Sequence, residues 1–232
     1  MRAFSGASLG MAALALSVSV GCSQVGQVQA KRSFKAANAA YQAQDYKKAA
    51  GLYEETLKAD PNLSMAYFFL GNSLDNMYKP SKAGQPENDS LLTRAVTNYE
   101  TCAEKLGNSA IEDEKKLAKL SLEYLVAAYG SDKLNDPGKA EPVLIKMINL
   151  EPKEPSNYAV LAKIYEDAAL YDDAEKVLVM SKEAKPSDAS VYMQLAGFYN
   201  RQGKFDKTIE ALNKGLNLPP GVDIKIRVIT GS

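Results

Sequence analysis

The pattern of apolar and polar residues repeats along the second half of the chain. Two blocks of 34 residues align without gaps: PSNYAVLAKIYEDAALYDDAEKVLVMSKEAKPSD from residue 155 and ASVYMQLAGFYNRQGKFDKTIEALNKGLNLPPGV from residue 189. The blocks agree in residue type at eight positions: Tyr158 with Tyr192, Leu161 with Leu195, Ala162 with Ala196, Tyr165 with Tyr199, Tyr171 with Phe205, Asp172 with Asp206, Leu178 with Leu212, and Pro186 with Pro220. Such a period predicts a stack of similar units, each too small to bury its own apolar surface.

The repeated positions resemble those of the tetratricopeptide repeat, a pair of antiparallel helices. In that family an aromatic residue, a Leu–small pair and a tyrosine mark the first helix, as Tyr158, Leu161–Ala162 and Tyr165 do here. A small–apolar–small pattern marks the second helix, and a proline closes the unit, as Pro186 does. The resemblance implies an all-α fold: a right-handed α-solenoid of about five helix-turn-helix repeats, with a core that is continuous from pair to pair.

The same spacings extend the repeat toward the N-terminus. Tyr46, Ala49, Tyr53 and Pro61 mark the first unit, and the second opens with MAYFFLGNSLDNMY after Ser64. The stretch KPSKAGQPENDS is rich in loop-forming residues, which predicts an inserted loop over 79–90 before the second helix resumes at 91. The predicted solenoid spans residues 31–221, with units at about 30–63, 64–107, 111–154, 155–188 and 189–222.

The N-terminus has the pattern of an export signal over residues 1–21. Arg2 precedes twelve mostly apolar residues at 9–20, too few to span a bilayer as a helix. Gly21 before Cys22 resembles a bacterial lipoprotein signal, which implies lipidation of Cys22 and a flexible tether over 22–30. Two alternatives stay open. VQA at 28–30 fits ordinary cleavage and a soluble product, and the run could instead be an N-terminal helix with no targeting role.

The C-terminal residues 222–232 depart from the helical pattern. Val222, Ile224, Ile226 and Val228 alternate with charged residues, which predicts a strand. Solenoids usually end with a polar capping helix, and none is evident in this sequence. Three interpretations remain: the natural chain continues, the tail packs on the last repeat, or it pairs with a partner's strand.

Composition excludes several kinds of chemistry. Lys plus Arg and Asp plus Glu number 28 each, so no basic excess indicates nucleic-acid binding. Histidine is absent, which removes histidine-based triads, histidine metal sites and the usual general base near neutral pH. Cys102 falls where the second helix of a repeat needs a small core residue. We therefore expect no enzyme activity, cofactor, metal site or small-molecule substrate.

Binding is the remaining function class, and the family resemblance implies where it occurs. In tetratricopeptide arrays the first helices line a concave groove that holds an extended peptide or a partner's helix. The residues expected to face that groove are Phe34, Asn38, Tyr41, Phe68, Asn72, Asp75, Asn76, Lys163, Glu166, Asp167, Met193, Asn200 and Arg201. Asn38 and Asn72 occupy equivalent places, where an amide can pair with a peptide backbone. This composition fits a partly apolar peptide.

These expectations combine into a lipid-anchored scaffold that binds a protein or peptide at the bacterial cell envelope. Ser23 after the lipidated cysteine, in place of Asp, favours the outer membrane, with the domain facing the periplasm. The alternatives are a soluble periplasmic binding module and the regulatory portion of a longer enzyme.

Overall fold

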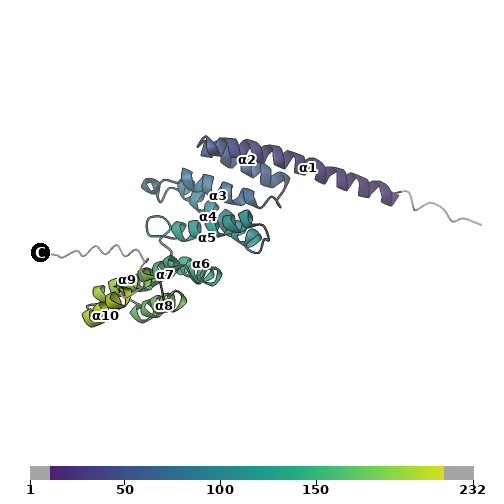
Figure 1. Cartoon of the computed structure of the whole chain (residues 1–232). Coiled ribbons are helices and arrows are strands. Elements are labelled where there is room, and N and C mark those ends of the chain that lie inside the picture. Colours follow the sequence, from purple (N-terminus) through teal and green to yellow (C-terminus); the bar gives the residue numbers. More distant parts are fainter. Residues whose placement is uncertain (1–10, 217–232) are drawn as a thin grey trace, which may run out of the picture. The chain divides into compact units, whose positions relative to one another are not determined.

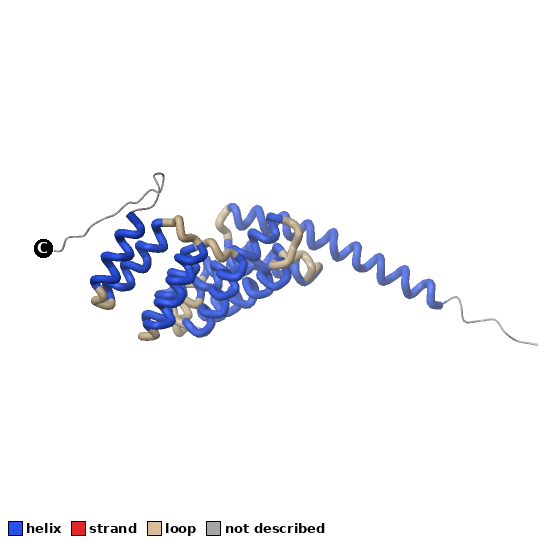
Figure 2. The backbone as a smooth tube through the Cα atoms, turned by 60° about the horizontal axis from the view of Figure 1, so that its bottom comes forward, coloured by secondary structure: helices blue, strands red, loops and turns tan. Residues whose placement is uncertain are grey.

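A computed structural model describes the backbone of residues 11–216 and the side chains from residue 25 onward within that range. In these residues the chain forms ten α-helices and one short 3₁₀ helix, and no strand (Figure 2). The strand predicted at 222–232 lies outside the described residues. The chain divides into two compact units, Met1–Ala128 and Tyr129–Ser232.

The first unit contains five α-helices (Figure 1). They are α1 (Met11–Gln42), α2 (Tyr46–Ala59), α3 (Met65–Met77), α4 (Pro86–Leu106) and α5 (Glu112–Ala128), with the 3₁₀ helix η1 (Pro80–Lys82) between α3 and α4. α1 packs against α2 and α3 against α4, and contacts of α2 with α3 and of α4 with α5 join the layers. This is the alternation of helix pairs that the repeat predicts.

The second unit repeats this arrangement. It contains α6 (Pro137–Leu150), α7 (Pro155–Asp167), α8 (Tyr171–Ala184), α9 (Ala189–Arg201) and α10 (Phe205–Leu216). α7 packs against α8 and α9 against α10, while α6 contacts α7 and α8 contacts α9. The predicted third repeat, 111–154, is divided, because α5 belongs to the first unit and α6 to the second.

The tight turns within the pairs recur with the sequence period. Asn135, Ala169 and Gly203 stand 34 residues apart, and all three have a positive φ, of 48°, 59° and 67°. Each stands two positions before the first residue of α6, α8 or α10, so one left-handed residue reverses the chain at each of these three turns. This backbone is natural for glycine and strained for alanine, which carries a Cβ.

Two kinds of hydrogen bond explain why tyrosine recurs at equivalent positions. The Tyr158 hydroxyl donates to the Pro152 carbonyl at 2.8 Å, and Tyr192 donates to Pro186 at 2.9 Å, across equivalent turns. Tyr165 likewise donates to the Glu141 carboxylate at 2.6 Å, and Tyr199 to Glu175 at 2.9 Å. The second kind of bond joins the second helix of one pair to the first helix of the next. The tyrosines thus hold consecutive layers together through their polar ends.

Small residues let the helices approach closely in the core. Leu161, Ala162, Leu195 and Ala196 are all 3–4% exposed. A Cβ built on Gly71 would lie 3.0 Å from the Tyr99 ring, so this position has no room for a side chain. Cys102 is a free thiol and fully buried, which confirms its predicted packing role. Burial also raises the pKa of the thiol and disfavours the reactive thiolate.

Two segments differ from the sequence prediction. The expected flexible tether at 22–30 is helical and belongs to α1. The later residues of segment 22–30 pack against the fold: Ala30 is 1% exposed, and a Cβ on Gly26 would lie 3.0 Å from the Ala59 carbonyl oxygen. Within the described residues no helix combines the length and apolar character needed to cross a bilayer.

The inserted loop is shorter than predicted, because α4 begins at Pro86 and not at residue 91. Proline suits the first turn of a helix, where no backbone N–H is needed. The Asn88 side chain closes the loop: its Oδ1 accepts from the Lys79 N–H at 2.9 Å and its Nδ2 donates to the Lys79 carbonyl at 3.1 Å.

The last described helix has an apolar face that no described residue covers. Phe205, Ile209 and Leu216 are 64%, 57% and 53% exposed. The opposite side of α10 buries Ala211 and Gly215 against α9. We call Phe205, Ile209 and Leu216 the α10 stripe.

Candidate functional site

A cavity of about 190 Å³ lies between the two consecutive first helices α7 and α9. Four of the residues predicted to face the groove line it together: Lys163 and Glu166 from α7, and Met193 and Arg201 from α9. The sequence prediction therefore converges on one cavity in the second unit. The remaining lining residues are Ala159, Ala162, Leu178, Gln194 and Gly197.

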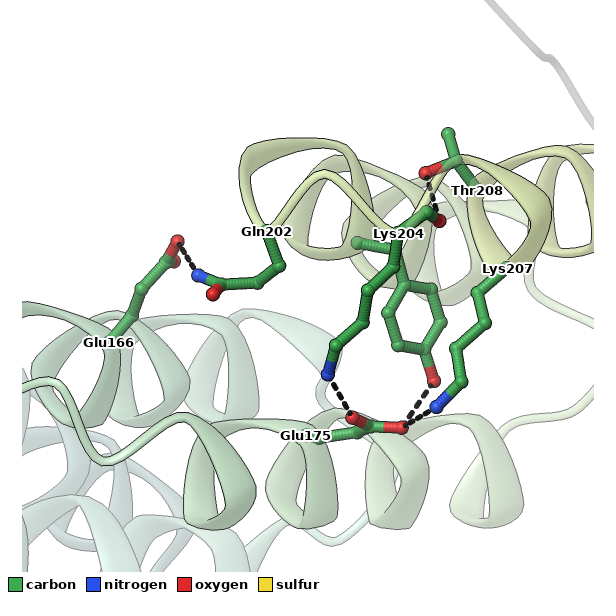
Figure 3. A network of polar contacts seen from close by, with 7 residues as sticks. Glu166, Glu175, Gln202, Lys204, Lys207 and Thr208 are labelled. Atoms are coloured by element: carbon green, nitrogen blue, oxygen red, sulfur yellow. Dashed lines mark hydrogen bonds and ion pairs between the residues drawn. The ribbon is translucent and has the colours of Figure 1, made fainter.

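A salt bridge forms one wall of this α7–α9 cavity. Arg201 Nε and Nη2 donate to Glu166 Oε1 and Oε2 at 2.8 and 2.9 Å, a two-point contact that fixes both planar groups. Gln202 adds a long contact of 3.5 Å from its Nε2 to the same carboxylate (Figure 3). These partners, above all the hydrogen bond from Arg201, hold the pKa of Glu166 below its usual value. Lys163 pairs along its own helix with Asp167.

One residue of the lining, Gln194, has a buried acceptor that lacks a donor. Ala159, Ala162, Leu178 and Met193 make much of the lining apolar. Gln194 Oε1 is buried and has no hydrogen-bond partner among the described residues. A buried acceptor without a partner costs free energy, which an incoming N–H or O–H group would recover. The site is therefore suited to a group with an apolar body and a hydrogen-bond donor.

Sequence reasoning missed Gln194 and Gly197 and included two residues that do not line the cavity. Asp167 at the end of α7 and Asn200 near the end of α9 are both exposed and lie outside the lining. Gln194, Gly197 and Arg201 are spaced by three and four residues and so share one helix face. From that spacing, Gln194 and Gly197 could have been predicted from the sequence as neighbours of Arg201 on the same helix face.

In the first unit the predicted asparagines bind tyrosine hydroxyls. Tyr41 donates to Asn72 Oδ1 at 2.6 Å, and Tyr53 donates to Asn38 Oδ1 at 2.7 Å. Asn76 Nδ2 donates to the Asn72 carbonyl at 2.8 Å and to its Oδ1 at 2.9 Å. Asn72 is 3% exposed, which differs from the expectation that it faces an open groove. It fixes Tyr41 and Asn76, which are more exposed.

The predicted phenylalanines belong to an aromatic cluster. Phe34 contacts Tyr53 and Phe69, with ring centroids 5.9 and 6.2 Å apart. Phe68 packs against Tyr99 and Tyr124 and is only 6% exposed, so it also differs from the expected groove position. Phe68 is buried because its helix face points toward the next layer, where removing the large apolar area of the ring from water is favourable.

Tyr99 is the deepest member of this cluster. It is fully buried, and its hydroxyl has no hydrogen-bond partner among the described residues. Burial is the main cause of its raised pKa, and the charge of Asp75, another predicted groove residue, adds to the effect. Tyr99 therefore stays uncharged and contributes through packing, while its hydroxyl group makes no hydrogen bond to a described residue.

Glu175 is the centre of a second polar network (Figure 3). It accepts hydrogen bonds from Tyr199 at 2.9 Å, Lys204 at 3.2 Å and Lys207 at 2.7 Å. Desolvation opposes the charged form, but the three donors prevail and lower the pKa of the carboxyl to about 2. The donors come from α9, α10 and the turn between them, so this network fastens the last pair to α8.

Comparison with known proteins shows the fold. No family model matches the chain. The crystal structure of MamA protein is 18% identical, covers 81% of this chain and 90% of its own, and superimposes with a TM-score of 0.57. A MamA fragment from Desulfovibrio magneticus RS-1 is 15% identical, covers 82% of this chain and 94% of its own, and has a TM-score of 0.51. At these identities the likeness is one of fold alone.

A curated relative matches part of the chain. Protein IFIT1 homolog B from Homo sapiens is 28% identical over 131 residues, which are 53% of this chain. The match spans only 27% of the human protein's length. With the 34-residue period and the helix pairs, these likenesses show an all-α, tetratricopeptide-like solenoid fold.

Proposed function

We propose that this protein is a binding scaffold that holds a segment of a partner protein against its first helices. The α7–α9 cavity supports this most directly, because it combines an apolar lining with the unpaired acceptor Gln194 Oε1. The expected partner segment is partly apolar and offers an N–H or O–H group to Gln194. Recognition involves no turnover: apolar contact supplies affinity, and the hydrogen bond fixes position.

The first unit offers a second contact surface in this proposal. Phe34, Asn38, Tyr41, Asp75 and Asn76 are partly or fully exposed. Asn72 and Phe68 support them from beneath through the Tyr41 hydrogen bond and the aromatic cluster.

A cavity-filling substitution tests the binding proposal. A Cβ on Gly197 would meet only the Arg201 side chain, at 3.4 Å, so Gly197→Leu fits the helix and fills the cavity. Leucine is a better helix former than glycine by about 0.5–1 kcal/mol, so folding should not suffer. The matched control is Gly51→Leu on α2, where a Cβ meets nothing within 4 Å.

The assay is quantitative co-purification from intact bacterial envelopes. We expect Gly197→Leu to lose the bound partner that wild type and Gly51→Leu both retain, with normal circular dichroism in all three. Equal recovery with both variants would show that the cavity takes no part in binding.

We further propose that the scaffold is exported and anchored through a lipid on Cys22. Two observations favour cleavage before Cys22 over cleavage after Ala30. Ala30 is 1% exposed, and Gly26 lies against the Ala59 carbonyl, so the second cleavage would remove packed residues. Cleavage before Cys22 keeps Gly26 and Ala30 in the mature protein. A soluble periplasmic module, or part of a longer enzyme, remains the alternative.

Fractionation of cells tests the anchor. Wild type should sediment with membranes and resist salt extraction, whereas Cys22→Ser should not be processed to the lipidated form. Mass spectrometry of the mature N-terminus should find a lipidated Cys22. A wild-type protein that is soluble and begins at Lys31 would contradict the proposal. Which envelope complex the scaffold serves would follow from the partner's identity.

A further inference from the structure

The exposed face of α1 carries an unusual set of residues. Lys31, Arg32 and Lys35 are all exposed, and none forms an ion pair with another described residue. Val25 and Val28 are 68% and 52% exposed on the same helix. At 3.6 residues per turn, the five side chains fall within an arc of about 120°. We call these five residues the α1 basic face.

The opposite side of α1 is the one that packs into the protein. Ala30 and Ala37 are 1% and 0% exposed and lie across the helix from the α1 basic face. No Asp or Glu occurs before Asp45, so no acidic residue of this segment neutralises the three cations. A helix face with cations and small apolar side chains, and no acids, is suited to the interface of an anionic membrane.

We infer that the α1 basic face lies on a phospholipid surface that carries anionic headgroups. The inference rests on the proposed anchor at Cys22, because only two residues, Ser23 and Gln24, lie between that cysteine and Val25. Such a short connection keeps the start of α1 at the membrane whatever the rest of the domain does. The cations contact headgroup phosphates, and the valines enter the headgroup region. The lipid anchor supplies retention, and the α1 basic face sets the orientation of the first unit.

The test uses a weak synthetic anchor, so that the contribution of the face can be measured. The chain from Cys22 to Ser232 is purified and a single tetradecyl chain is attached to the Cys22 thiol through a maleimide. Cys102 remains unmodified in the folded protein because it is fully buried. One chain of this length binds vesicles only marginally, with a constant of about 10⁴ M⁻¹. Partition is measured on phosphatidylcholine vesicles with and without phosphatidylglycerol.

Each basic residue near an anionic surface contributes about fivefold, so three should strengthen binding about 100-fold on the phosphatidylglycerol vesicles. The variant Lys31→Gln, Arg32→Gln, Lys35→Gln should lose this gain and bind both vesicles alike. The matched control, Lys82→Gln, Lys146→Gln, Lys153→Gln, removes the same charge from exposed positions elsewhere and should bind like wild type.

Two results would overturn the inference: wild type with no preference for anionic vesicles, or equal losses in the two triple variants. Either would leave the anchor proposal standing, because the synthetic chain replaces the natural lipid in this assay. Failure of the cell fractionation would in turn leave the vesicle result unaffected.

Discussion

The network around Glu175 makes the stability of the last helix pair depend on pH. Glu175→Gln keeps the side-chain shape and removes the charge that Tyr199, Lys204 and Lys207 bind. The carboxyl has a folded pKa of about 2, against an ordinary value of 4.5. A lowered folded pKa means that the charged form stabilises the fold. The contribution is complete above about pH 4.5 and disappears as the pH falls through 2.

The magnitude follows from the shift and from the exposure of the groups. A fall from 4.5 to about 2 corresponds to an upper limit of about 3 kcal/mol. The Lys204 and Lys207 side chains are 40% and 50% exposed and Glu175 is 23% exposed, so water screens the ion pairs. We therefore expect Glu175→Gln to lower the free energy of unfolding by about 1–2 kcal/mol at pH 7.

Urea unfolding of both proteins between pH 7 and pH 2.5 measures the effect. The difference between wild type and variant cancels the titration of every other carboxyl, and it should shrink as the pH falls below 4.5. Glu141→Gln is the control, because Glu141 accepts the equivalent tyrosine bond but no described lysine pairs with it. Glu141→Gln should lower the free energy of unfolding by less than Glu175→Gln does. A difference for Glu175→Gln that stays constant with pH would refute the lysine contacts.

Three further predictions concern single sites. Ala169→Gly should raise the free energy of unfolding by about 1 kcal/mol, and Gly203→Ala should lower it by a similar amount, because both residues have a positive φ. Thermal unfolding measures both changes as shifts of the midpoint in opposite directions. Tyr99→Phe should be neutral or slightly stabilising because its hydroxyl has no described partner, whereas Tyr53→Phe should cost about 1 kcal/mol in chemical denaturation. Cys102 should react with a thiol reagent only at the rate of unfolding; rapid labelling in native buffer would mean that the core opens locally.

The repeat made most of the helix pairs predictable, because each is specified by residues that recur at fixed spacing. Tyr158 and Tyr192 could be matched from sequence alone, and their hydrogen bonds to proline carbonyls give the physical reason for the match. Spacing could not show that Asn72 is buried, because a helix face near a groove also contacts the next layer. The length of α1 was missed for a similar reason, since its packing depends on Ala59, far along the chain.

The candidate cavity was predictable in part. Lys163, Glu166, Met193 and Arg201 line one cavity because the first helices of consecutive units align, and their role in binding stays a prediction. The salt bridge between Glu166 and Arg201 joins residues 35 apart, nearly one full repeat, yet no periodic pattern marks it. An ion pair of this kind depends on side-chain reach, which the sequence period does not encode.

The α10 stripe makes the C-terminal pair the natural point at which to lengthen the protein. Within the described residues, the pair α7 and α8 has helix neighbours on two sides, α6 and α9, whereas α9 and α10 contact only α7 and α8 besides each other. A designed helix pair with a complementary apolar face, joined after Leu216, would bury Phe205, Ile209 and Leu216 without rearranging any earlier layer. The chain can thus be treated as a modular array, to which binding surfaces are added one helix pair at a time.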